Sequence, residues 1–107
     1  MTQIMERLNR ELESFGRRAQ AALDEGKLQI ELLRLRRQQD AAARDIGLLV
    51  HRRERGSETE PRRFDALLLR LDDLEADITR LEGEIAARRR ARTERDAAPE
   101  PPVAAHS

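Results

Sequence analysis

The chain has 107 residues, which leaves room for one small domain. Charged residues make up 39% of it and aromatic residues only 2%, so the composition argues against a thick globular core and favours long helices or a coiled coil. The formal net charge of zero provides no overall attraction to nucleic acid or anionic membranes, and the absence of cysteine excludes disulfides, thiolate metal sites and cysteine nucleophiles.

Residues 1–26 are predicted to form an N-terminal amphipathic helix. Their apolar residues recur in steps of three and four, the spacing of a helical stripe: Met1, Met5, Leu8, Leu12, Phe15, Ala19 and Ala22. Leu28 begins the next apolar seam six residues after Ala22, where a heptad needs seven, so the stripe loses phase there. Gly26 lies inside this slip, and glycine weakens a helix interior. The helix is therefore expected either to continue, with or without a kink, or to fold back at Gly26.

Residues 27–95 are predicted to form an antiparallel coiled-coil hairpin with its turn near 54–59, so that the fold class is all-α. Each arm carries a heptad seam, the first made of Leu28, Leu32, Leu35, Gln39, Ala42, Ile46 and Leu49, and the second of Phe64, Leu67, Leu71, Leu74, Ile78, Leu81 and Ile85. If the chain reverses between Gly56 and Ser57, every a position of one arm faces a d position of the other, from Leu49 with Phe64 to Leu28 with Ile85. Glycine and serine are common turn residues, so the reversal that the seams require falls where the sequence favours a turn.

Three further features of the hairpin can be read from the sequence. Gln39 is a polar residue on the seam, where a single polar residue commonly specifies register at some cost in stability. The register also brings Arg36 beside Glu75. Several apolar residues lie off the seam and indicate that another surface covers them: Ile30, Leu33, Leu48, Val50, Leu68 and Leu69.

Residues 96–107 (DAAPEPPVAAHS) are rich in proline and alanine and are predicted to form a disordered tail. The start of the chain, Met1 to Arg10, has no apolar run typical of a signal peptide, and no apolar stretch is long enough to span a bilayer. We therefore expect a cytoplasmic protein without a transmembrane segment.

The sequence offers no constellation for catalysis. His51 and His106 have no His or Cys partner at metal-ligand spacing, the acidic residues lie mostly off the seam, and no glycine-rich phosphate loop occurs. We therefore expect no enzyme activity, no cofactor and no metal site. The expected function is that of a structural or protein-interaction module.

Two surfaces are candidates for binding. The stripe of Met5, Leu8, Leu12 and Phe15 lies too far from the end of the second arm to be covered by it, which predicts a protein partner or a homo-oligomer. The alternative is nucleic-acid binding through arginines crowded at the hairpin tip: Arg52, Arg53, Arg55, Arg62 and Arg63. No aromatic residues alternate with these arginines for base stacking, so nucleic acid is the less favoured partner.

The run LQIELLRLRRQQDAAARDIGLLVHRRERG, residues 28–56, resembles a group of small bacterial coiled-coil hairpin proteins. In that group a heptad helix ends in a step of leucine or isoleucine, glycine and two apolar residues, here Ile46 to Leu49. A polar turn and a second heptad helix follow, here LLLRLDDLEADITRLEGEIAA at 67–87. Many relatives continue into a C-terminal zinc ribbon, whose cysteine ligands are absent from this sequence. The resemblance implies a bacterial cytoplasmic protein with no metal function.

Overall fold

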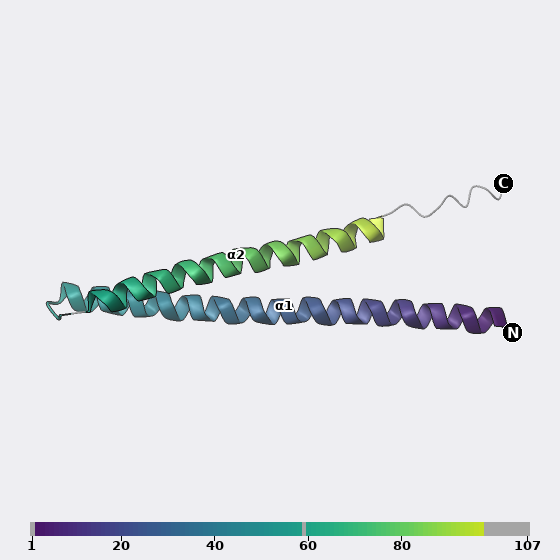
Figure 1. The fold of residues 1–107 in the computed structure, drawn as a ribbon, viewed down its shortest axis with the longest axis horizontal. Coiled ribbons are helices and arrows are strands. Elements are labelled where there is room, and N and C mark those ends of the chain that lie inside the picture. Colours follow the sequence, from purple (N-terminus) through teal and green to yellow (C-terminus); the bar gives the residue numbers. More distant parts are fainter. Residues whose placement is uncertain (1, 59, 98–107) are drawn as a thin grey trace.

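The protein is an antiparallel helical hairpin, as predicted. The computed structural model describes residues 2–58 and 60–97. Helix α1 spans Thr2–Glu54 and helix α2 spans Pro61–Ala97, and no strand occurs in the described residues. The molecule measures 83 × 28 × 16 Å. Figure 1 shows α2 running back along α1 from the tip and diverging from it, while α1 continues past the end of α2.

Helix α1 is continuous through Gly26, so the separate N-terminal helix over 1–26 is not confirmed. The chain does not fold back there. Glycine in a helix interior costs only about 1 kcal/mol relative to alanine. Contacts with α2 lie on both sides of Gly26, because Glu25 binds two arginines of α2 and Leu28 packs against the hydrophobic core.

The turn at the tip follows from a glycine-terminated helix end. Gly56 has a φ of 87°, a left-handed conformation that glycine adopts without a Cβ penalty. The Ser57 amide donates to the Arg52 carbonyl oxygen at 2.9 Å, and the Gly56 amide donates to the Arg53 carbonyl oxygen at 3.0 Å. These two bonds form a Schellman motif, which satisfies carbonyl groups left free at the helix end. The connection between the helices runs from the end of α1 at Glu54 to the start of α2 at Pro61, the region in which the turn near 54–59 was expected.

Helix α2 begins at a proline. Pro61 occupies the first helical position, where its missing amide proton costs nothing. The Glu60 carbonyl oxygen accepts hydrogen bonds from the amides of Arg63, at 3.1 Å, and Phe64, at 3.4 Å. The helix ends at Ala97, so Asp96 and Ala97 are helical and not part of a disordered tail. The rest of the predicted tail, residues 98–107, lies outside the described residues.

The core lies on the predicted seam. Its most buried side chains are Leu32, Leu35, Ala42, Leu49, Leu74, Ile78, Leu81 and Ile85. The other seam residues are half-buried: Leu28, Gln39, Ile46, Phe64, Leu67 and Leu71. The contact of Glu25, one turn before Leu28, with Arg89, one turn after Ile85, agrees with the predicted facing of Leu28 and Ile85.

One predicted charge contact is wrong. Arg36 pairs with Glu82 at 3.2 Å and not with Glu75, which lies one heptad closer to the tip. In an antiparallel pair with heptad spacing, a long side chain beside the seam can reach either of two positions on the facing helix that are one heptad apart. Both partners are about half exposed, so this ion pair adds little to stability.

Candidate interaction surface

The four candidate partner-binding residues lie together on one exposed face of α1. Their exposed fractions are 62% for Met5, 49% for Leu8, 60% for Leu12 and 71% for Phe15. They belong to the part of α1 that extends past the end of α2 (Figure 1). Because α2 does not cover them, their burial requires another surface.

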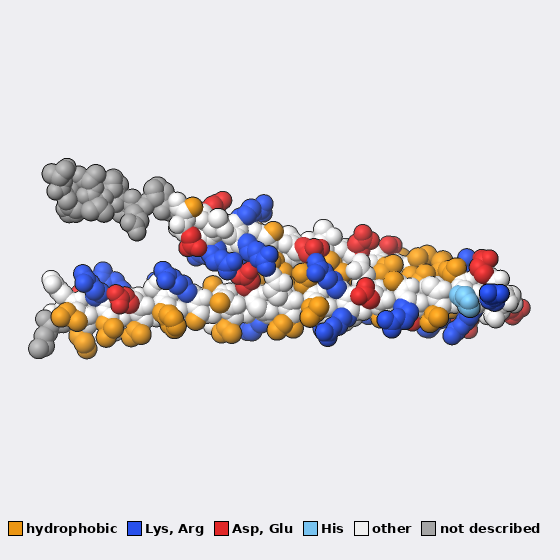
Figure 2. Space-filling model, turned by 180° about the vertical axis from the view of Figure 1, so that it is seen from behind, with side chains coloured by type: hydrophobic (Ala, Val, Ile, Leu, Met, Phe, Trp, Pro, Cys, Tyr) orange, Lys and Arg blue, Asp and Glu red, His pale blue; other side chains and the backbone are white. Residues whose placement is uncertain are grey.

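The exposed stripe is longer than the sequence analysis predicted. Figure 2 shows apolar side chains gathered along the edge of α1 that faces away from α2. We call the following set the outer stripe: Ile4, Met5, Leu8, Leu12, Phe15, Leu23, Ile30 and Leu33. The step from Ala19 to Leu23 keeps the stripe on one face of a straight helix, which has 3.6 residues per turn. A periodicity of 3.6 would have revealed this continuation, whereas the heptad count ended at Ala22.

The face of α1 that carries the seam becomes polar before Leu28. Gln3, Arg10 and Arg17 lie on this face by helical spacing, and all three are exposed. The described hairpin core accordingly begins at Leu28 and does not continue towards the N-terminus. The two apolar faces of α1 are therefore distinct. One packs against α2 between Leu28 and Leu49, and the other points away from it.

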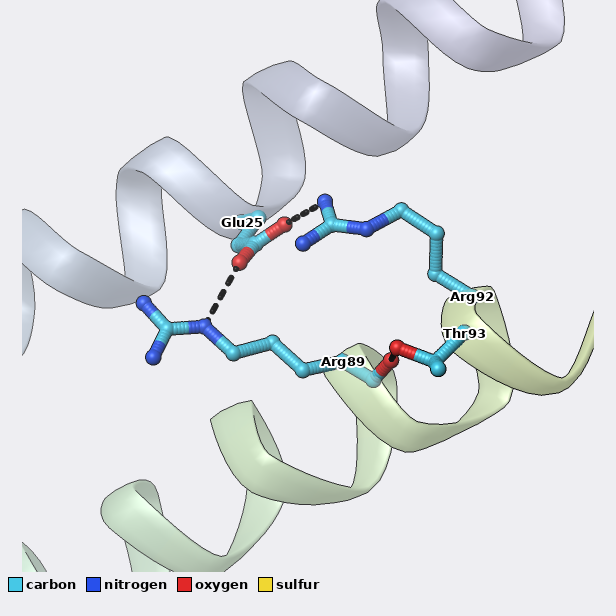
Figure 3. Close-up of polar contacts among 4 residues, drawn as sticks. All are labelled: Glu25, Arg89, Arg92 and Thr93. Carbon is cyan, nitrogen blue, oxygen red and sulfur yellow. Dashed lines mark hydrogen bonds and ion pairs between the residues drawn. The ribbon is translucent and has the colours of Figure 1, made fainter. Parts of the chain in front are cut away.

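A charged contact marks the point where the hairpin core ends (Figure 3). Arg89 donates to one carboxylate oxygen of Glu25 at 3.2 Å, and Arg92 donates to the other at 2.6 Å. The Glu25 side chain is only 17% exposed. The hydrogen bond from Arg89, reinforced by the charge of Arg92, holds the pKa of the Glu25 carboxyl below its ordinary value of 4.5. This contact joins α1 to α2 at the end of the hairpin core. We call the segment of α1 that precedes Glu25 the overhang.

The structure also brings the five tip arginines together around the turn. Arg52 and Arg53 lie in the last turn of α1, Arg55 lies in the connection, and Arg62 and Arg63 lie in the first turn of α2; all are exposed. The Arg53 guanidinium lies 5.6 Å from the centre of the Phe64 ring, a cation–π contact across the turn. The exposed carboxylates of Glu54, Glu58 and Glu60 lie in the same region and reduce its positive charge.

Within the described residues, no group of three or more His, Cys, Asp or Glu side chains could hold a metal ion. His51 is exposed on α1, and His106 lies outside the described residues. None of the helical residues that the structure describes forms a segment long and apolar enough to cross a membrane.

Comparison with known proteins returns no family model, no curated protein and no solved structure that matches this chain. The resemblance to bacterial coiled-coil hairpin proteins therefore rests on the sequence pattern alone.

Proposed function

We propose that this protein is a non-enzymatic coiled-coil interaction module of the cytoplasm. The outer stripe binds a protein surface, and the hairpin serves as a rigid spacer about 38 Å long, from some 25 residues at about 1.5 Å each. The observation that supports this proposal is the exposure of Met5, Leu8, Leu12 and Phe15 on a face of α1 that α2 does not cover.

Helix stability supports the same proposal. Short helices without tertiary packing are marginal in water, because nucleation is costly and each added hydrogen bond contributes little. The first two dozen residues of α1 continue the hairpin helix, but nearly all of their side chains are exposed, so little tertiary packing supports their helical form. A partner that covers the outer stripe would supply the missing packing. Methionine and phenylalanine suit this role, since methionine adapts its shape and phenylalanine offers a large contact area.

The magnitude of the available burial is consistent with reversible binding. Fully burying a large apolar side chain contributes about 1.5–3 kcal/mol. The eight residues of the outer stripe are between 49% and 72% exposed. Together they offer roughly 10 kcal/mol, against an association cost of roughly 4–15 kcal/mol. Binding through this stripe should therefore be moderate in strength and sensitive to protein concentration.

Replacing Leu8 and Phe15 together by aspartate tests the proposal. The variant should lose self-association or partner binding, while the hairpin keeps its helicity because its core begins at Leu28. Light scattering and circular dichroism measure the two properties. The control is Gln3→Asp with Ser14→Asp, which adds the same two groups to the polar face of the same segment. If the Leu8/Phe15 variant instead unfolds from a protein that is already monomeric, the stripe is core and the proposal is wrong.

The rival function is nucleic-acid binding at the basic tip, for which the clustering of five exposed arginines is the supporting observation. Binding to phosphates releases counterions and weakens steeply as salt is raised. A titration of duplex and single-stranded nucleic acid at two salt concentrations separates the two functions. Salt-dependent binding that is lost in Arg52→Ala/Arg62→Ala and retained in Leu8→Asp/Phe15→Asp would favour the rival.

A further inference from the structure

We infer that the partner of the outer stripe is a second copy of this chain, docked antiparallel so that the overhanging segments of two α1 helices pack against each other. This inference rests on the proposed function and names the occupant of the same surface. Two observations carry it: the arrangement of large and small residues along the stripe, and two charges of opposite sign beside it.

The order of side-chain sizes fits an antiparallel copy. When the two-fold axis passes between Leu12 and Phe15, Leu12 of each copy faces Phe15 of the other. Leu8 then faces Ala19, and Met5 faces Ala22, so each large side chain meets a small one at the next layers. In antiparallel helix pairs with heptad spacing, a positions face d positions. The steps of three and four residues make Met5, Leu12 and Ala19 a positions and Leu8, Phe15 and Ala22 d positions, so each of these pairs joins an a to a d.

The charges beside the stripe are complementary in the same register. Glu11 precedes Leu12 and Arg18 precedes Ala19, so both lie on the same flank, two turns apart. The two-fold axis brings Glu11 of each copy opposite Arg18 of the other, which forms two equivalent ion pairs. Both side chains are exposed, and neither takes part in an ion pair within the part of the chain that the structure describes.

The hairpin leaves this docking site open. The outer stripe points away from α2 (Figure 2), so a second α1 can approach without displacing α2. Leu23 reaches the level of Ile4 of the second copy, which places the end of the overlap near the Glu25 contact with Arg89 and Arg92. The two hairpins then extend in opposite directions from a shared central segment. Ile30 and Leu33 lie beyond this overlap.

Charge reversal tests both the second copy and its register. Glu11→Arg or Arg18→Glu alone places like charges opposite each other at two sites, and each variant should weaken dimerisation roughly tenfold. The double variant Glu11→Arg/Arg18→Glu recreates both pairs with reversed polarity and should restore wild-type association. Sedimentation equilibrium measures the dissociation constants at low salt, where exposed charges act most strongly. The controls Glu6→Arg and Arg17→Glu change the same charges on the polar face and should leave dimerisation unchanged.

Three outcomes would overturn the inference. Single and double variants that weaken association additively would show that Glu11 and Arg18 do not face each other, as in a register that covers Ile30 and Leu33. Controls as damaging as the test variants would show a general charge effect. A wild-type chain that stays monomeric at high concentration would exclude a second copy. If the monomeric chain instead binds a different protein, and the Leu8→Asp/Phe15→Asp variant loses that binding, the proposed interaction function is still supported.

Discussion

Replacing Gln39 by leucine should stabilise the hairpin. Gln39 is half-buried on the seam, where the sequence register places it opposite Leu74, which is 5% exposed. Leucine has a similar length and no amide to desolvate. Since full burial of leucine contributes about 1.5–3 kcal/mol, a half-buried site should gain roughly 1 kcal/mol. For a chain of this size that gain raises the melting temperature by about 5 °C.

Thermal unfolding followed by circular dichroism at fixed protein concentration measures this effect. The control is Gln3→Leu, the same chemical change on the exposed polar face of the overhang, which should leave the melting temperature of the hairpin unchanged. Equal melting temperatures for wild type and Gln39→Leu would refute the reasoning, because they would show that position 39 gains no burial. An entirely apolar seam also loses its register marker, so the variant should show additional larger species in light scattering.

Two further predictions concern the core and the charged contact at its end. Leu81→Ala should lower the free energy of unfolding by about 2–3 kcal/mol in a urea titration, because Leu81 is 5% exposed, whereas Leu69→Ala, at a 65% exposed site, should change it by less than about 0.5 kcal/mol. Equal losses of unfolding free energy in the two variants would show that Leu81 does not belong to the core. Glu25→Gln should melt below wild type at neutral pH, and this difference should shrink as the pH falls. The folded state depresses the pKa of Glu25, so its stabilisation is present above the ordinary value of 4.5 and is lost as the pH falls through the lower, folded-state pKa. A difference in melting temperature that is independent of pH would contradict this role of Glu25.

The hairpin could be predicted because two independent signals agree in the sequence. The seams of the two arms align only if the chain reverses near Gly56, and the left-handed conformation of Gly56 is one that glycine adopts readily. Burial of Leu74, Ile78 and Leu81 follows from the seam spacing alone. These features depend on local periodicity and turn chemistry, both of which a single sequence contains.

Other features depend on energies that the sequence pattern does not display. A glycine penalty of about 1 kcal/mol suggested a break at Gly26, yet α1 is continuous there and contacts α2 through Glu25 on one side and Leu28 on the other. The choice of Arg36 between Glu75 and Glu82 depends on side-chain reach, which residue spacing does not determine. The heptad steps from Met1 to Ala22 do not predict the continuation of the outer stripe through Leu23, because Leu23 follows Ala19 at a four-residue step that stays on the same face of a straight helix.

The candidate site is exposed because the two helices differ in length. Helix α1 has 53 residues and α2 has 37, so α2 cannot cover the whole of α1. The seam face of α1 is polar around Arg10, and a charged contact of Glu25 with α2 lies at the end of the core. The apolar residues of the overhang lie instead on the opposite face, where their burial does not compete with that of the hairpin core. The two apolar faces of α1 therefore stay apart: the seam determines the hairpin, and the outer stripe is exposed on the opposite face.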